Sequence, residues 1–145
     1  MDGVFALSDL RVLYPRKSEA SLFRILALFE KEGVLFKIKR GLYYTSNASL
    51  VRISSRINPK SYISTGTVLA KNLIIGAVPV NKVQAIKVGK PRKYICEAGI
   101  IEHLSISENL FFGFETINGI RYATKEKAFL DTCYYFYKRK SFSFN

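Results

Sequence analysis

The side chains best suited to chemistry in this sequence are cations and small hydroxyls, gathered in two stretches near the N-terminus. The first stretch contains Arg16, Lys17, Ser18, Ser21 and Arg24, and the second contains Lys37, Lys39 and Arg40. Guanidinium and ammonium groups bind phosphate oxygens, and arginine also reads guanine edges in the major groove of DNA. The set therefore predicts binding to a polyanion.

A helix over about Glu19 to Glu32 would position the first stretch. Its expected buried face consists of Leu22, Ile25, Leu26 and Phe29. Their spacing follows one side of a helix and puts Arg24 near the opposite side. Ser18 suits the N-cap, and Gly33 suits a left-handed C-cap.

A basic hairpin is predicted directly after this helix. Residues 34–38 alternate as a strand, and a turn at Lys39-Arg40-Gly41 leads into a second strand. Upstream, a brief helix opens at Ser8-Asp9 and must end at Pro15, because proline has no amide hydrogen to continue it. Two helices and a basic hairpin in this order are typical of a winged helix-turn-helix, which we expect over residues 1–47.

The rest of the chain predicts an α+β fold. Residues 45–58 are rich in Ser, Asn and Arg and are expected to form a connector with about one helical turn. We expect residues 58–145 to form a small, mainly antiparallel sheet with packed helices. The expected strands cover residues 83–88, 93–96, 100–104 and 111–117. Asn118-Gly119 predicts a type I′ hairpin turn, because both residues tolerate positive φ angles.

Two further helices are predicted in this second part. One covers about Thr65 to Leu73. The other is capped by Thr124 and is expected to pack on the sheet through Phe129, Leu130, Cys133, Tyr134 and Tyr137.

Charge and composition narrow the function classes. The net charge is +12, and residues 51–100 alone carry nine Lys and Arg against one Glu. A winged helix leaves this block unexplained, so the second half is expected to touch nucleic acid or an acidic partner, or to be merely a solvated basic surface. No apolar run approaches the roughly 18 residues of a membrane span. The N-terminus lacks a secretory pattern, which predicts a cytoplasmic protein with Cys96 and Cys133 as reduced core residues.

Catalytic patterns are sparse. The single histidine, His103, follows Glu102 on a predicted strand, where neighbours point to opposite faces. Glu126 and Asp131 are five residues apart and are expected to form salt bridges with nearby lysines. There is no phosphate-binding glycine loop and no zinc-ligand spacing. We therefore expect no enzyme activity, no cofactor and no metal.

Three segments resemble the AbiEi-family antitoxins of type IV toxin/antitoxin systems. Residues 32–43, Glu-Gly-Val-Leu-Phe-Lys-Ile-Lys-Arg-Gly-Leu-Tyr, resemble the wing of that family. Tyr62-Ile63-Ser64, with residues 67–69 and 72–74, is similar to its helix after the linker. Residues 122–131 resemble its Ala-Thr-Pro-Glu-Lys-Ala-x-x-Asp segment, with Lys125 in place of proline.

This resemblance implies a DNA-binding autorepressor of its own operon that also neutralises a nucleotidyltransferase-like toxin. In that hypothesis Arg24, Ser18 and Ser21 approach the major groove of the operator. The phosphates or the minor groove would be contacted by Arg16, Lys17, Lys37, Lys39 and Arg40. The alternatives are a protein-interaction module with a basic docking surface and no sequence-specific DNA binding, and a nuclease that uses Glu126 or Asp131.

Overall fold

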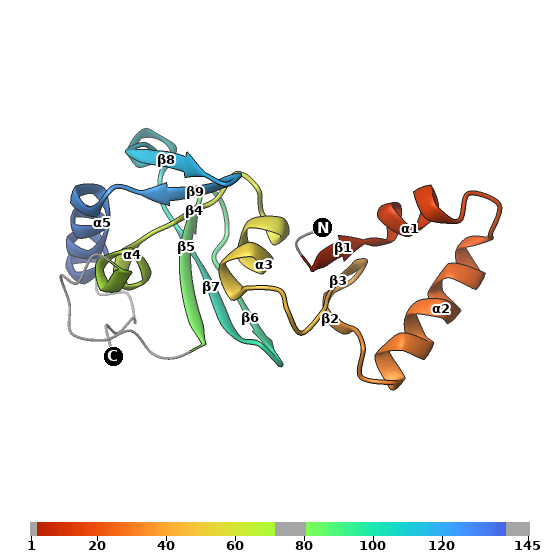
Figure 1. The fold of residues 1–145 in the computed structure, drawn as a ribbon. Helices are drawn as coiled ribbons and strands as arrows, with labels where there is room; N and C mark the ends of the chain where they lie inside the picture. Colours follow the sequence, from red (N-terminus) through yellow and green to blue (C-terminus); the bar gives the residue numbers. More distant parts are fainter. Residues whose placement is uncertain (1–2, 72–80, 139–145) are drawn as a thin grey trace.

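The computed structural model of the protein describes residues 3–71 and 81–138. Within them, five α-helices accompany a sheet of three strands and a sheet of six strands (Figure 1). The strand order is β1-β3-β2 in the small sheet and β6-β7-β5-β4-β9-β8 in the large sheet. The predicted α+β class is confirmed.

The N-terminal part contains two helices and the small sheet. Its elements are β1 (Val4–Ala6), α1 (Leu7–Leu13), α2 (Glu19–Lys31), β2 (Phe36–Lys39) and β3 (Leu42–Tyr44). Ser18 caps α2, because its Oγ accepts a hydrogen bond from the Ser21 backbone N–H at 3.2 Å. Gly33 follows α2 with a φ of +76°, as a left-handed C-cap requires. Strand β1, which had no predicted counterpart, pairs antiparallel with β3.

The buried side of α2 is narrower than predicted. Leu22 and Leu26 are buried, but Ile25 is only half-buried and Phe29 is exposed. The two leucines form a core cluster with Leu10, Leu35 and Tyr43. These partners come from α1 and the hairpin, so they cover one stripe of the helix and leave Phe29 outside it.

The predicted connector is wrong over α3 (Leu50–Ile57), which is a helix capped by the Ser49 side chain. Ile53 and Ile57 of this helix are buried in a cluster that includes Tyr44 of the small sheet and Ile101 of the large one. The Ser- and Arg-rich composition suggested a connector. The helix has one apolar side at helical spacing, and its Ser and Arg residues lie mostly on the other side.

The large sheet is mixed. Its strands are β4 (Tyr62–Ile63), β5 (Lys82–Lys87), β6 (Arg92–Cys96), β7 (Gly99–Ser105), β8 (Phe114–Ile117) and β9 (Ile120–Ala123). The β4–β5, β6–β7 and β8–β9 pairs are antiparallel, whereas β4–β9 and β5–β7 are parallel. Three of the five strand pairs are antiparallel, as expected of a mainly antiparallel sheet, but the two parallel pairs were not predicted. The Asn118-Gly119 turn has φ values of 52° and 79°, which confirms the predicted hairpin.

Helices cover both faces of the large sheet (Figure 1). Helices α4 (Thr65–Lys71) and α5 (Lys125–Tyr137) lie on one face, and α3 lies on the other, towards the small sheet. Leu73, predicted to end the first of these helices, lies outside the described residues. A 3-10 helix, η1 (Glu108–Leu110), precedes β8.

The predicted packing face of α5 is wrong. Phe129, Leu130, Cys133 and Tyr137 are exposed, and Tyr134 is half-buried. The residues that face the sheet are instead Lys127, Ala128, Asp131, Thr132 and Tyr135. This polar side faces inward because Asp131 and Lys127 form hydrogen bonds there with Tyr62, Ser64 and the Leu110 carbonyl. The two cysteines are unpaired, but Cys96 is only half-buried and Cys133 is exposed, so the prediction of core positions also fails.

Candidate functional site

The six predicted DNA-binding cations all lie at the surface. Arg16 and Lys17 lie between α1 and α2, Arg24 lies on α2, Lys37 and Lys39 lie on β2, and Arg40 lies in the hairpin turn. All six are exposed. None forms an ion pair with any residue that the structure describes. Their charges are therefore available to an external anion.

Lys37 and Lys39 owe their exposure to the alternation of β2. Phe36 and Ile38, which alternate with the two lysines, are half-buried, and these two apolar side chains pack into the cluster shared by both sheets. Because successive strand residues point to opposite faces, both lysines face solvent.

The two predicted hydroxyls have a local structural role. Ser18 Oγ accepts the Ser21 N–H and also donates to Ser21 Oγ at 3.1 Å. This pair closes the first turn of α2, so the hydroxyls hold the N-terminus of the helix that carries Arg24.

The hairpin lies beside the basic middle of the chain. Tyr94 and Cys96 of β6 belong to the same cluster as Phe36 and Ile38 of β2. The Tyr44 phenol also accepts a hydrogen bond from the Ala98 N–H at 3.1 Å. Arg92 and Lys93 of β6 are both exposed. Arg92 lies opposite His103 and shares the face of Tyr94, whereas Lys93 lies opposite Glu102 on the other face of the sheet. Composition revealed this basic block, but nothing local in the sequence placed it next to the hairpin.

His103 is buried at the same junction. Its Nε2 lies 2.9 Å from Ser54 Oγ of α3, and its ring meets Tyr94 edge-on. Burial of the imidazole, with the positive charges of Lys87 and Lys39, lowers the pKa of His103 to about 4. The side chain is therefore neutral at pH 7. Its neighbour Glu102 pairs with Lys82 at 2.8 Å, on the other face of the sheet.

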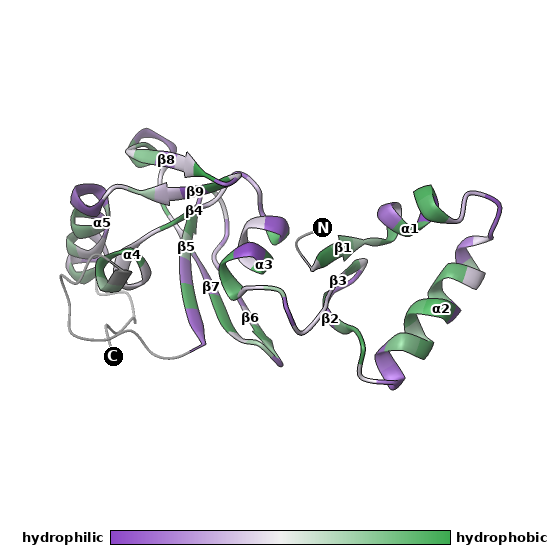
Figure 2. Ribbon diagram, viewed as in Figure 1, coloured by the Kyte–Doolittle hydropathy of each residue, from purple (hydrophilic) through white to green (hydrophobic). Residues whose placement is uncertain are grey.

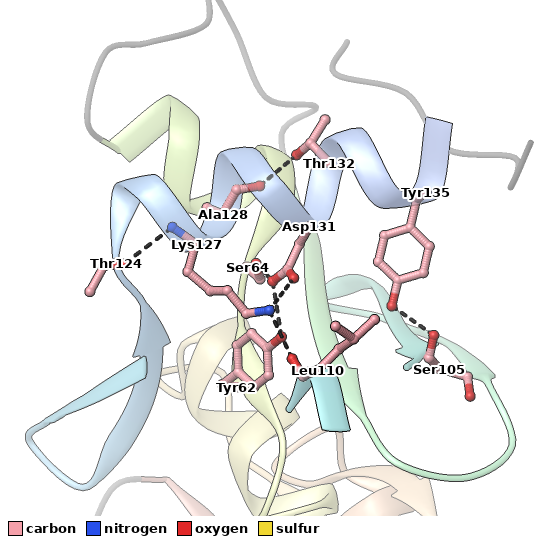
Figure 3. Close-up of polar contacts among 10 residues, drawn as sticks. All are labelled: Tyr62, Ser64, Ser105, Leu110, Thr124, Lys127, Ala128, Asp131, Thr132 and Tyr135. Carbon is pink, nitrogen blue, oxygen red and sulfur yellow. Dashed lines mark hydrogen bonds and ion pairs between the residues drawn. The ribbon is translucent and has the colours of Figure 1, made fainter. Parts of the chain in front are cut away.

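A buried carboxylate network holds α5 against the sheet (Figure 3). Asp131, only 1% exposed, accepts hydrogen bonds from the Tyr62 phenol at 2.9 Å and from Ser64 Oγ at 2.8 Å. Lys127 Nζ lies 2.9 Å from the other carboxylate oxygen. The same ammonium donates to the Leu110 carbonyl at 2.8 Å, which ties η1 to the helix.

Every polar group of this network has a partner. Burial, followed by the negative charge of Asp131, raises the pKa of Tyr62 far above its ordinary value, so the phenol stays a donor. One turn further along α5, the Tyr135 hydroxyl donates to the Ser105 carbonyl at 2.7 Å (Figure 3). Asp131 does form the predicted salt bridge to a lysine. Its other two partners lie 67 and 69 positions away and had no local signal.

The outward face of α5 is apolar. Phe129 and Leu130 line a hollow of about 370 Å³ together with Lys125 and Glu126. Phe136 is exposed further along, and Tyr137 is 84% exposed. Figure 2 shows hydrophobic stretches along both α5 and α2. Exposed apolar residues gathered on one helix are typical of a surface that binds another protein.

Within residues 3–71 and 81–138, no group of three His, Cys, Asp or Glu side chains is arranged to hold a metal ion. In that same part of the chain, none of the helices has the length and apolar character that crossing a bilayer requires. No protein-family model matches this chain, and neither does any curated protein.

Proposed function

We propose that the protein is a winged-helix transcriptional autorepressor that binds its own operator, and that it is also an antitoxin for a nucleotidyltransferase-like toxin. The observation that carries the DNA-binding part is the arrangement of unpaired cations on α2, on the turn before it and on the β2–β3 hairpin. A helix followed by a basic hairpin suits a duplex, since the helix fits the major groove and the hairpin reaches the adjacent backbone.

Each cation has a role in this proposal. Arg24 reads a base edge in the major groove, next to Ser18 and Ser21 at the start of α2. Arg16 and Lys17 contact phosphates at the helix entry. Lys37, Lys39 and Arg40 follow the phosphates or the minor groove. Arg92 of β6, exposed and on the same strand face as Tyr94, extends this surface towards the large sheet.

The salt dependence of binding tests the phosphate contacts. Five cationic contacts predict that the logarithm of the association constant falls against the logarithm of salt concentration with a slope on the order of −4. Fluorescence anisotropy with the duplex upstream of the chain's own reading frame measures this slope. Arg40→Ala should reduce it by about 1, and the exposed Lys125→Ala on α5 should leave it unchanged. A slope near zero would contradict the proposal.

The sequence dependence of binding tests the base contact. Arg24→Ala should cost roughly 1–3 kcal/mol on the cognate duplex and little on an unrelated one. An equal loss on both duplexes would assign Arg24 to phosphate instead.

The antitoxin part draws support from the exposed apolar face of α5. Leu130→Asp should abolish rescue of growth when the chain is co-expressed with a toxin encoded in the neighbouring frame. Operator affinity should not change, because α5 lies across the large sheet from the hairpin (Figure 1). Capture of a toxin with no duplex binding at low salt would instead favour the protein-interaction module.

A further inference from the structure

We propose that a cleft on the large sheet binds a small phosphorylated ligand with a planar ring, of the nucleoside monophosphate class. The cleft has a volume of about 330 Å³, within the range of ligand pockets. Its lining residues are Asn58, Lys60, Lys87, Val88, Glu108 and Phe111. They come from the turn after α3, the end of β5 and the segment around η1. The site is separate from the α2 surface and from the α5 face, so it does not depend on the proposed function.

The walls of the cleft are fixed by hydrogen bonds to backbone groups. The Asn58 carbonyl accepts from the Ser61 N–H at 3.0 Å and from Ser61 Oγ at 2.7 Å. The Lys60 N–H donates to Asn58 Oδ1 at 3.1 Å, and the Lys60 carbonyl accepts from the Arg121 guanidinium at 3.0 Å. On the other wall, the Lys87 carbonyl accepts from the Ile106 N–H at 3.0 Å. Both lysines therefore extend from an ordered backbone.

The cleft presents two cations that lack an anion. Neither Lys60 nor Lys87 forms an ion pair with any residue in the described parts of the chain. Lys87 is half-buried, and an ammonium partly removed from water gains more from an incoming anion than a fully solvated one. Phosphate oxygens are the natural partners, because two lysines can share one phosphate through charge-assisted hydrogen bonds.

Phe111 and Glu108 would recognise the part of the ligand that carries no phosphate. Phe111 is half-buried, and its ring is held edge-on by Tyr62 and Phe114, each with a ring-centre distance of 5.2 Å. A fixed aromatic ring is a platform on which a base stacks. Glu108, exposed at the cleft, can accept hydrogen bonds from ribose hydroxyls or a base amino group. Its negative charge also disfavours a second and third phosphate, which points to a monophosphate.

Isothermal titration of the full chain at about 150 mM salt tests the proposal. The probes are AMP, GMP, CMP and UMP, with ribose 5-phosphate and inorganic phosphate as ring-free probes and nucleosides as phosphate-free probes. We expect saturable one-to-one binding of at least one monophosphate, about tenfold or more tighter than its nucleoside or ribose 5-phosphate. No saturable binding of any monophosphate at millimolar concentration would overturn the proposal.

Variants separate the cleft from general attraction to a basic protein. Lys87→Ala and the surface variant Lys60→Gln should each weaken monophosphate binding roughly tenfold, which corresponds to about 1.4 kcal/mol. Phe111→Leu should weaken monophosphate binding and leave ribose 5-phosphate unaffected. The matched controls Lys90→Ala and Lys31→Ala, both exposed and outside the cleft, should bind as the parent does. Equal losses in these controls, or unchanged binding in both Lys87→Ala and Lys60→Gln, would overturn the proposal.

Discussion

Asp131 and Lys127 form an ion pair that is almost removed from water, at 1% and 6% exposure. Such a pair contributes little net stability as a unit, but removing one member leaves the other charge buried without its partner. Tyr62 and Ser64 supply the remaining hydrogen bonds of the carboxylate, so the network stays satisfied only while all four side chains are present.

Asp131→Ala should lower the free energy of unfolding by about 3–5 kcal/mol, because Lys127 keeps its charge in the interior. The double variant Lys127→Met/Asp131→Leu should recover a large part of this loss. Urea denaturation followed by circular dichroism measures both. Glu126→Gln, at an exposed neighbouring position, should stay within about 0.5 kcal/mol of the parent. If Asp131→Ala lowered the free energy of unfolding by less than about 0.5 kcal/mol, the ion pair would not be essential to the core.

His103 should make stability depend on pH between about 4 and 6.5. An unfolded histidine takes up a proton below its ordinary pKa of 6.5, whereas burial keeps the folded side chain neutral down to about 4. Protonation therefore favours the unfolded chain in this window. The stabilisation is complete above pH 6.5 and falls by about 3 kcal/mol as the pH drops to 4.

The measurement for His103 is the difference in unfolding free energy between the parent and His103→Gln at several pH values. Glutamine can still bond to Ser54 but does not titrate, so the difference should change across the window and stay constant above it. A constant difference from pH 4 to 7 would show that His103 takes up its proton at the same pH in the folded and unfolded chains, and that burial does not lower its pKa.

At the scale of the element, α5 contradicts the usual rule that the apolar side of a helix faces the core. Its inward side carries the Lys127–Asp131 ion pair and the Tyr135 hydroxyl, which bond to groups on other elements. Phe129 and Leu130 are exposed on the outward side. Two leucines of the same packing layer allow a direct comparison. Leu69 of α4 is 1% exposed, and Leu130 of α5 is 58% exposed.

Leu69→Ala should cost about 2–5 kcal/mol of unfolding free energy, as a buried leucine does when it leaves a cavity. Leu130→Ala should cost less than about 0.5 kcal/mol, because its side chain already contacts water. Thermal or urea unfolding of the two variants under one set of conditions provides the comparison. Equal losses would mean that the outer face of α5 is packed in the isolated protein.

At the scale of the whole molecule, α3 joins the two sheets. Ile53 is fully buried among residues of the small sheet and Ile101 of the large one, and Ser54 bonds to His103. Arg56 also donates to the Val4 carbonyl at 3.1 Å. One core thus runs through the junction, which links the proposed DNA-binding surface mechanically to the large sheet.

Ile53→Ala should lower the free energy of unfolding by about 2–5 kcal/mol and should affect both sheets together. Hydrogen exchange of amides in β3 and β7 reports on each sheet separately. Both sets should lose protection by similar factors, whereas the exposed Leu28→Ala on α2 should change neither set greatly. Lost protection in β3 alone would show that the small sheet opens independently.

Local signals in the sequence predicted the features that depend on a few neighbouring residues. The Ser18 cap, the Gly33 stop and the Asn118-Gly119 hairpin follow from backbone conformations and hydrogen bonds spanning about four residues. The exposure of Arg24 and Lys39 was also predictable, since a charge without a partner stays in water.

Long-range contacts determined the remainder. The parallel β4–β9 and β5–β7 pairs, the seat of α3 between two sheets and the partners of Asp131 each join residues far apart in the chain. The periodicity of apolar residues shows that a helix has an apolar and a polar face. Which face is buried depends on the side chains and backbone groups of the neighbouring elements. On α5 a phenol, a hydroxyl and a carbonyl lie opposite, so the side with the carboxylate and the ammonium became the inner one.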